Sequence, residues 1–236
     1  MKLFSLLLLA PTILRAQTAE ERLHNDWANL GRYRDSNTVV PAPKPGENRV
    51  VFMGNSITEG WKKFFPEQFA NKPYINRGIG GQTTPQMLVR FRQDVVALQP
   101  KVVVILAGTN DIAGNTGVMT NEEIQGNLAS MSELAHAHKI KVVMSSVTPV
   151  SEYHVANPRV APQTTARPME RIKALNEWMK SYAAEHGDVY LDYFTAMIDD
   201  KGLMRTELTE DDLHPNAKGY AIMAPLAEAA IARALK

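Results

Sequence analysis

Five short apolar segments, separated by longer helical patterns, recur along the chain and limit the folds that it can adopt. The segments are residues 49–53, 74–77, 101–107, 140–145 and 189–193. Within the third segment, the run from Val102 to Leu106 has no polar residue, which is typical of a central strand buried on both faces. The helical patterns lie near residues 60–70, 85–98, 121–138, 167–186 and 217–235. Strands that alternate with helices predict a three-layer, flavodoxin-like α/β/α fold with a five-stranded parallel sheet.

The first residues have the pattern of a secretory signal peptide. A single positive charge, Lys2, precedes a mostly apolar run over residues 3–14, which is too short to cross a bilayer comfortably. We expect residues 1–16 to be removed, with cleavage after Ala16 or after Ala19. The alternative is a buried N-terminal helix. The signal interpretation predicts export to the periplasm or to the medium.

The rest of the chain is long enough for one good-sized domain and marginal for two. We expect that domain over residues 49–236, preceded by an N-terminal region over residues 17–48. Residues 19–35 of this region have the periodicity of an amphipathic helix. Residues 36–48 are rich in proline and predict an extended linker onto the first strand.

The composition excludes several kinds of site and partner. The chain has no cysteine, which excludes disulfides, thiolate metal sites, a cysteine nucleophile and a lipid-modified cysteine. Its 26 basic and 25 acidic side chains give a formal net charge of +1 without any basic block, so we expect no nucleic-acid partner. Nothing after the signal peptide predicts stable insertion into a membrane. No histidines have the spacing of a metal site, and we expect neither a metal nor a nucleotide cofactor.

Polar and glycine residues follow several of the predicted strands at the point where each strand ends. Ser56 follows the first strand, residues 78–81 follow the second, Asn110 follows the third, and residues 211–214 follow the fifth after a longer excursion. Each has an ordinary explanation alone: a helix cap, a tight turn or weak dinucleotide loop, a turn residue, and a surface histidine. Parallel strands bring their carboxyl ends to one edge of the sheet, so we expect these residues to lie together.

Together these residues supply the groups that acyl transfer requires. Ser56 would attack a carbonyl carbon, and His214 would take its proton and return it to the leaving alcohol. Asp211 would hold the imidazole and stabilise its charged form. The oxyanion would be stabilised by the backbone N–H of Ser56, a glycine N–H in residues 78–81 and the amide of Asn110.

Four motifs in this order resemble those of the SGNH hydrolases, also called GDSL-type esterases. They are Gly54-Asn55-Ser56-Ile57-Thr58, Gly78-Ile79-Gly80-Gly81, Gly108-Thr109-Asn110-Asp111 and Asp211-Asp212-Leu213-His214, within about residues 49–220. The second and third motifs look most like the catalytic subunits of platelet-activating-factor acetylhydrolase. The resemblance implies the SGNH hydrolase fold, with Ser56 as nucleophile, His214 as base and Asp211 as its partner. It also implies that Gly81 and Asn110 complete the oxyanion hole with Ser56.

Three residues depart from the motifs of this family or leave an alternative open. Asn55 stands where the family usually has an aspartate that braces the loop, and we expect this change to be tolerated. Gln82 replaces the frequent aspartate after the oxyanion glycine, a change that could alter access for substrate. Asp212 is an adjacent alternative to Asp211, which the family spacing favours.

The sequence therefore predicts an exported serine esterase that works through an acyl-enzyme. We expect it to remove short acyl groups, such as acetyl, from a carbohydrate or a similar polar alcohol. The alternatives are a lysophospholipase- or thioesterase-like hydrolase for longer acyl chains, and a non-catalytic glycan-binding protein on the same fold. Residues 111–120 and 150–168 are the loops in which we expect substrate specificity to reside.

Overall fold

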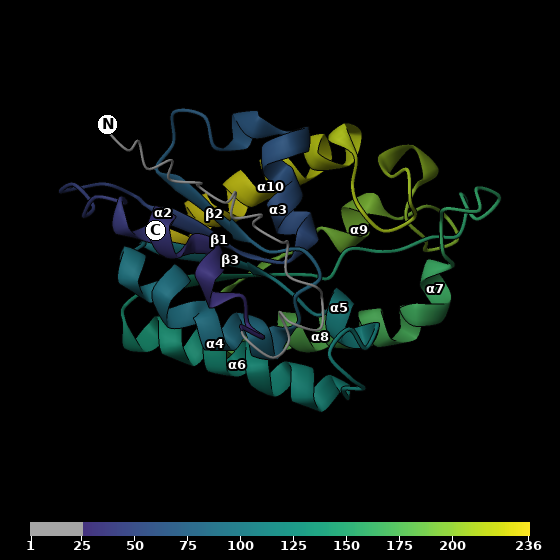
Figure 1. Cartoon of the computed structure of the whole chain (residues 1–236), viewed down its shortest axis with the longest axis horizontal. Coiled ribbons are helices and arrows are strands. Elements are labelled where there is room, and N and C mark those ends of the chain that lie inside the picture. The colour runs from purple at the N-terminus through teal and green to yellow at the C-terminus, as the bar shows by residue number, and fades with distance from the viewer. Residues whose placement is uncertain (1–25) are drawn as a thin grey trace, which may run out of the picture.

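A five-stranded, fully parallel sheet forms the centre of the computed structural model, which describes residues 26–236 (Figure 1). Its strands lie in the order β2-β1-β3-β4-β5. They are β1 (Val50–Gly54), β2 (Tyr74–Gly78), β3 (Val102–Leu106), β4 (Lys141–Ser145) and β5 (Val189–Leu191). The predicted three-layer α/β/α fold with a five-stranded parallel sheet is confirmed, and each predicted strand is present at its predicted place.

Helices cover both faces of the sheet, as Figure 1 shows. The longer ones are α3 (Ser56–Phe64), α4 (Thr84–Asp94), α6 (Asn121–Ala137), α8 (Met169–His186) and α10 (Ala217–Ala234). Alternate residues of each strand face opposite layers: Val51 and Met53 pack with α4, α6 and α8, whereas Val50 and Phe52 pack with α3 and α10. The central strands are apolar throughout because both of their faces are buried.

Short helical segments connect these elements. They are η1 (Leu30–Tyr33), α2 (Arg34–Thr38), η2 (Pro66–Gln68), η3 (Val96–Leu98), α5 (Thr109–Ile112), α7 (Gln163–Ala166), α9 (Phe194–Met197) and η4 (Thr206–Leu208).

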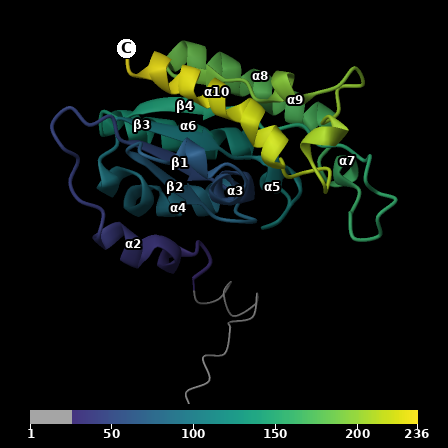
Figure 2. The ribbon, with the colours of Figure 1, turned by 90° about the horizontal axis from the view of Figure 1, so that it is seen from above.

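The N-terminal region differs from the predicted single helix over residues 19–35. Among the described residues, helical structure begins at Leu30 with η1 and continues through α2 to Thr38. It begins this late because Asn29 has a left-handed backbone (φ 53°) and Asp26 accepts hydrogen bonds from the next two backbone amides, those of Leu30 and Gly31. The predicted signal peptide and the first part of the predicted helix lie outside the described residues. Helix α2 lies beyond the β2 edge of the sheet (Figure 2).

Helix α3 also begins earlier than the helix predicted near residues 60–70. Asn55 caps it, since its side-chain oxygen accepts a hydrogen bond from the backbone N–H of Ile57, 3.0 Å away. The helix therefore starts at Ser56 itself and ends at Phe64. The aromatic residues of this region lie mainly in the core, where Trp61 packs against Phe52 and Tyr220.

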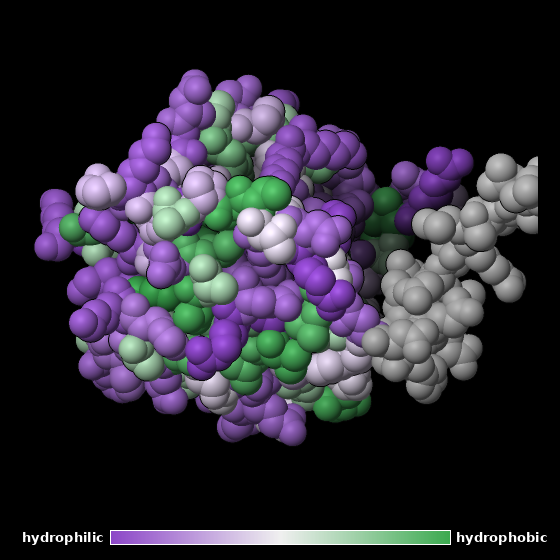
Figure 3. All heavy atoms as spheres, turned by 60° about the vertical axis from the view of Figure 1, so that its left-hand side comes forward, coloured by the Kyte–Doolittle hydropathy of each residue, from purple (hydrophilic) through white to green (hydrophobic). Residues whose placement is uncertain are grey.

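The surface is mixed in character. The face that comes forward in Figure 3 carries mostly hydrophilic residues with scattered apolar patches between them. Within residues 26–236, no helix is both long enough and apolar enough to cross a membrane.

Candidate active site

The carboxyl ends of the three strands β1, β2 and β3 meet at one edge of the sheet. Gly54 at the end of β1 is in register with Gly78 on one side and with Leu106 on the other. The chain order along the sheet changes direction at β1 and β3, and open α/β sheets place their ligands at such a point. The loops that carry the predicted site residues after β1, β2 and β3 therefore begin side by side at the carboxyl edge of the sheet.

Helix α3 approaches the end of β2 so closely that only glycine fits at position 78. A Cβ on Gly78 would lie 2.1 Å from the backbone nitrogen of Glu59, far inside van der Waals contact. This close packing places the first turn of α3, which carries Ser56, directly against the loop that follows β2.

Ser56, His214 and Asp211 form one continuous chain of hydrogen bonds. The Oγ of Ser56 lies 2.9 Å from Nε2 of His214, and Nδ1 of His214 lies 2.7 Å from Oδ2 of Asp211. When Nδ1–H donates to the carboxylate, Nε2 carries the lone pair that accepts the serine hydroxyl. The structure thus brings together residues that are 158 positions apart in the sequence.

The loop that carries Asp211 and His214 is closed at its base. Thr209 and Pro215 form an antiparallel bridge, and the side chain of Asn216 caps α10 by accepting from the N–H groups of Lys218 and Gly219. This closed loop fixes the imidazole of His214 above the first turn of α3.

The carboxylate of Asp211 is held in its charged form. Burial alone would raise its pKa, but hydrogen bonds from the ring and backbone of His214, and from the backbone of Leu213, hold the pKa well below the usual range. Oδ1 accepts from the N–H of His214 at 2.7 Å, while Oδ2 faces the ring. A permanently charged acceptor at this position stabilises a positively charged imidazole.

The side chain of Asp212 has a different set of contacts. Its backbone is left-handed (φ 65°), its side chain is fully buried, and its carboxylate accepts from Ser151 Oγ, His154 Nδ1 and two backbone N–H groups. Burial alone would raise its pKa, but the hydrogen bonds have the larger combined effect and hold the pKa below the usual range. Of the two adjacent aspartates, Asp211 contacts the imidazole, and Asp212 anchors the start of the 150–168 loop.

The three predicted oxyanion donors differ in how their hydrogens are already used. The backbone N–H groups of Gly78 and Gly80 donate to Asn76 Oδ1 and Glu59 Oε2, each at 2.9 Å. Within the described chain, the N–H groups of Ser56 and Gly81 have no protein acceptor. The Nδ2 group of Asn110 gives one hydrogen to the carbonyl of Gln82 (2.9 Å) and keeps the other.

This arrangement suits an oxyanion. Gly81 has a left-handed backbone (φ 77°), which glycine adopts without strain. Its N–H has no acceptor among the described residues, whereas the N–H of Gly80 already donates to Glu59. The N–H of Ser56 lies at the N-terminus of α3, where the helix dipole favours negative charge. Gly81, rather than Gly78 or Gly80, therefore stays the proposed oxyanion donor of this loop.

Two departures from the family pattern have structural roles. Asn55 caps α3 as described above. Gln82 is buried, where its Nε2 donates to the carbonyl of Ala28 and its Oε1 accepts from Nε of Arg90. Gln82 thus links the loop after β2 to the N-terminal region.

Arg90 is the residue of this region whose role the sequence did not indicate. It is fully buried on α4 and donates to Gln82 Oε1 (2.5 Å), to the carbonyl of Gly54 (3.0 Å) and to Asp94 Oδ2 (3.0 Å). Asp94 in turn accepts from Nδ2 of Asn37 at 2.7 Å. One guanidinium therefore joins the end of β1, the loop after β2 and α2. The helical periodicity of α4 did not predict that Arg90 is buried or that it makes these contacts.

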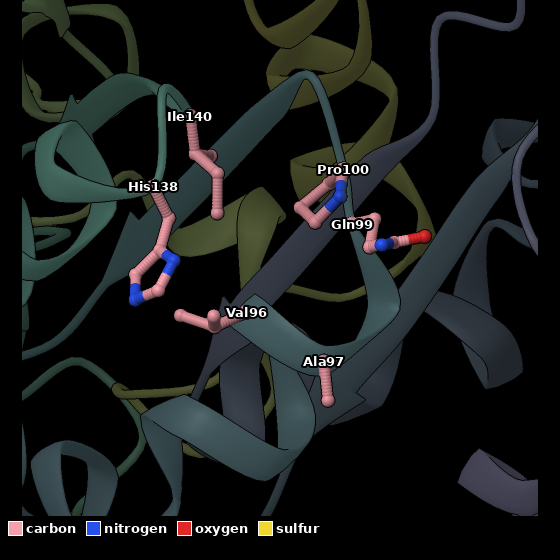
Figure 4. A pocket seen from close by; sticks show the side chains of 6 residues that line it. All are labelled: Val96, Ala97, Gln99, Pro100, His138 and Ile140. Carbon is pink, nitrogen blue, oxygen red and sulfur yellow. The ribbon is translucent and has the colours of Figure 1, made fainter.

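A hollow of about 410 Å³ lies at the opposite, amino-terminal edge of the sheet (Figure 4). Its lining comes from the segments that precede β3 and β4: Val96, Ala97, Gln99, Pro100, His138 and Ile140. None of the predicted catalytic groups lies there, and we assign the chemistry to the carboxyl edge on the geometry of its side chains. Within residues 26–236, no cluster of acidic and histidine side chains is placed to hold a metal ion.

Comparison with known proteins agrees with this geometry. The model of the GDSL-like Lipase/Acylhydrolase family matches residues 52–222. The chain belongs to this family. A GDSL-like lipase from Bacteroides thetaiotaomicron is 41% identical, with a TM-score of 0.82 over 89% of this chain and 100% of that one. The described domain is thus a carboxylic ester hydrolase of the GDSL type.

Two curated relatives are more distant. The uncharacterized lipoprotein YqeF of Bacillus subtilis is 36% identical over 45% of this chain and 51% of its own length. An acetylxylan esterase of Xylanibacter ruminicola is 25% identical over 86% of this chain and 46% of its own length. The chain spans about half the length of the curated relatives that it matches.

Proposed function

We propose that this protein is an exported serine esterase that removes acetyl groups from an acylated carbohydrate through an acyl-enzyme. The observation that carries the reaction type is the unbroken hydrogen-bond chain from Ser56 through His214 to Asp211. The serine lies within hydrogen-bond distance of the histidine, and the histidine within hydrogen-bond distance of the aspartate, as the proposed covalent acyl transfer requires.

In the first half of the reaction, Ser56 Oγ attacks the ester carbonyl carbon while its proton passes to Nε2 of His214. The oxyanion of the tetrahedral intermediate accepts hydrogen bonds from the N–H groups of Ser56 and Gly81 and from Nδ2 of Asn110. The intermediate then collapses, the bond between carbonyl carbon and alcohol oxygen breaks, and His214 returns the proton to that oxygen. The alcohol leaves, and the acyl group remains on Ser56.

In the second half, water takes the place of the alcohol. His214 accepts a proton from the water as its oxygen attacks the acyl carbon, and the same donors stabilise the second oxyanion. Collapse breaks the bond to Ser56 Oγ, which recovers its proton from His214, and the carboxylic acid leaves. Throughout, the charged Asp211 stabilises the imidazolium that forms twice in each cycle.

The choice of an acetylated carbohydrate is supported by one of the relatives. The acetylxylan esterase among the relatives matches over most of this chain, although at only 25% identity. Export is supported by the signal-peptide pattern of residues 1–16 and by the lipoprotein among the relatives.

Ser56→Ala tests the nucleophile. We expect a loss of at least about 10⁴-fold in kcat for p-nitrophenyl acetate, measured on pure protein. Ser130→Ala, in which a surface serine of α6 is changed, is the matched control and should retain full activity. Full activity in Ser56→Ala would show that another group is the nucleophile.

Chain-length preference tests the acyl group. We expect kcat/KM to fall in the order acetate, butyrate and octanoate when the three p-nitrophenyl esters are compared. A clear preference for octanoate would overturn the acetyl proposal in favour of a lysophospholipase- or thioesterase-like activity.

A further inference from the structure

The N-terminal region lies against the loop that carries the oxyanion glycine, although it precedes the part of the chain that the family model matches. Three side-chain amides hold it there by donating to its backbone carbonyls. Gln82 donates to Ala28 O (2.7 Å), Gln86 to Trp27 O (2.6 Å) and Gln93 to Leu30 O (2.8 Å). A further hydrogen bond runs from the hydroxyl of Tyr33 to the carbonyl of Gly78. Residues 26–33 are thus fixed beside the site.

A hollow of about 490 Å³ lies between this region and the loop after β2. It is lined by Asp26, Trp27, Asn29, Ile79, Gly80, Gly81, Gln82, Gln86, Asn115 and Thr116. The hollow reaches the reacting groups, because Gly81 is one of the proposed oxyanion donors. A Cβ on Gly80 would lie only 3.9 Å from Cβ of Ser56.

The chemistry of the lining favours a neutral, hydroxyl-rich ligand. Trp27 is 38% exposed and offers an aromatic surface, while most of the other side chains carry amides or hydroxyls. Among the described residues, no lysine or arginine lines the hollow. Both carboxylate oxygens of Asp26 already accept hydrogen bonds from backbone N–H groups. A sugar ring matches such a surface, since its C–H face packs on an aromatic ring and its hydroxyls pair with amides.

Asn115 is placed to contact such a ligand. Its Nδ2 donates to the carbonyl of Gly81 at 3.0 Å, which fixes the side chain beside the oxyanion loop. Its Oδ1 accepts no hydrogen bond from the described residues and is available to a ligand hydroxyl. Ile79 is the aliphatic side chain of the lining and is buried, so a long acyl chain would find little apolar surface here.

We propose that this hollow binds the sugar ring of the ester, with Trp27 as its stacking surface and Asn115 as a hydrogen-bond acceptor. The inference rests on the proposed acetyl-carbohydrate activity and deepens it. The volume of the hollow indicates which part of the ester it binds. About 490 Å³ suits a small-molecule ligand and is far more than an acetyl methyl group fills. The N-terminal region therefore contributes to specificity.

The test compares a methyl xyloside that carries one acetyl group with ethyl acetate, which has no ring. For Trp27→Ala, we expect the ratio of kcat/KM for the sugar ester to kcat/KM for ethyl acetate to fall about tenfold. Trp27→Phe should recover part of the ratio. Val39→Ala removes another exposed apolar side chain of the same region, away from the hollow, and should leave the ratio unchanged.

Binding is measured separately by calorimetry in the Ser56→Ala background, where the acetylated xyloside is not consumed. There Trp27→Ala should weaken binding about tenfold, with an unchanged melting temperature as evidence of an intact fold. If the wild type hydrolyses the sugar ester and Trp27→Ala changes neither the ratio nor the binding, this inference is overturned and the proposed function stands. If the wild type hydrolyses ethyl acetate but neither hydrolyses nor binds the sugar ester, both are overturned.

Discussion

Removal of the Asp94 carboxylate is expected to destabilise the domain by about 3–5 kcal/mol, because it leaves a buried guanidinium without its charge partner. The side chains of Arg90 and Asp94 are both 0% exposed, and their charged groups lie 3.0 Å apart. In Asp94→Ala, Arg90 retains its hydrogen bonds to Gln82 and to the carbonyl of Gly54, but these acceptors are neutral. Asn37 also loses its 2.7 Å hydrogen bond to Asp94.

Urea unfolding followed by circular dichroism measures the loss. In a domain of this size, about 3–5 kcal/mol corresponds to a fall in Tm of roughly 6–20 °C. The matched control is Glu207→Ala, which removes an acidic residue from an exposed ion pair with Arg205 and should cost at most about 1 kcal/mol. If the two variants lost the same small free energy of unfolding, the ion pair between Arg90 and Asp94 would not have the role assigned to it.

The double variant Arg90→Met/Asp94→Leu separates buried charge from packing. It removes both charges, so we expect it to be more stable than Asp94→Ala. Recovery should be incomplete, because Oε1 of Gln82 then lacks its donor, which costs about 1–3 kcal/mol for a buried polar group. A double variant less stable than Asp94→Ala would refute the argument from charge.

Three further predictions concern single residues. Asp211→Asn should lower kcat for p-nitrophenyl acetate by about 10⁴-fold, whereas Asp212→Asn should mainly lower the melting temperature; equal losses of kcat would contradict the separate roles assigned to the two aspartates. The folded-state pKa of each is lowered, so each stabilises the fold above its unfolded pKa of about 3.9 and loses that contribution as the pH falls below it. Urea unfolding from pH 6 to pH 3 should therefore show falling stability, with a shallower slope in Asp212→Asn than in the wild type. Gly78→Ala should prevent normal folding because its Cβ would overlap the backbone of Glu59, while Gly126→Ala, in open space on α6, should raise the free energy of unfolding by about 0.5–1 kcal/mol.

The sheet could be predicted because each strand is indicated by a short apolar run of consecutive residues. The run from Val102 to Leu106 indicates burial on both faces, and parallel strands fix the edge at which the loops meet. The proximity of Ser56 to His214 follows from that edge, without knowledge of any side-chain position. The approximate limits of the strands follow from the same alternation of patterns.

Other features depend on contacts between distant segments and left no local pattern. The motif spacing favoured Asp211 over Asp212, but it did not indicate the left-handed backbone of Asp212 or the contact of its carboxylate with Ser151. Among the described residues, helical structure begins at Leu30 after a turn around Asp26, and α4, far away in the sequence, holds the residue next to Asp26. Arg90 has the appearance of an ordinary polar residue within a helical pattern, and its burial is set by partners in three other segments.

The position of Asp212 next to Asp211 also limits how the 150–168 loop can be redesigned. A replacement loop must present donors to the buried carboxylate of Asp212 where Ser151 and His154 do so now. A graft without them would leave an unpaired charge in the interior, one residue away from Asp211, the proposed partner of His214. Loop exchange aimed at new substrates can therefore begin after His154, and the residues before that point should be carried over unchanged.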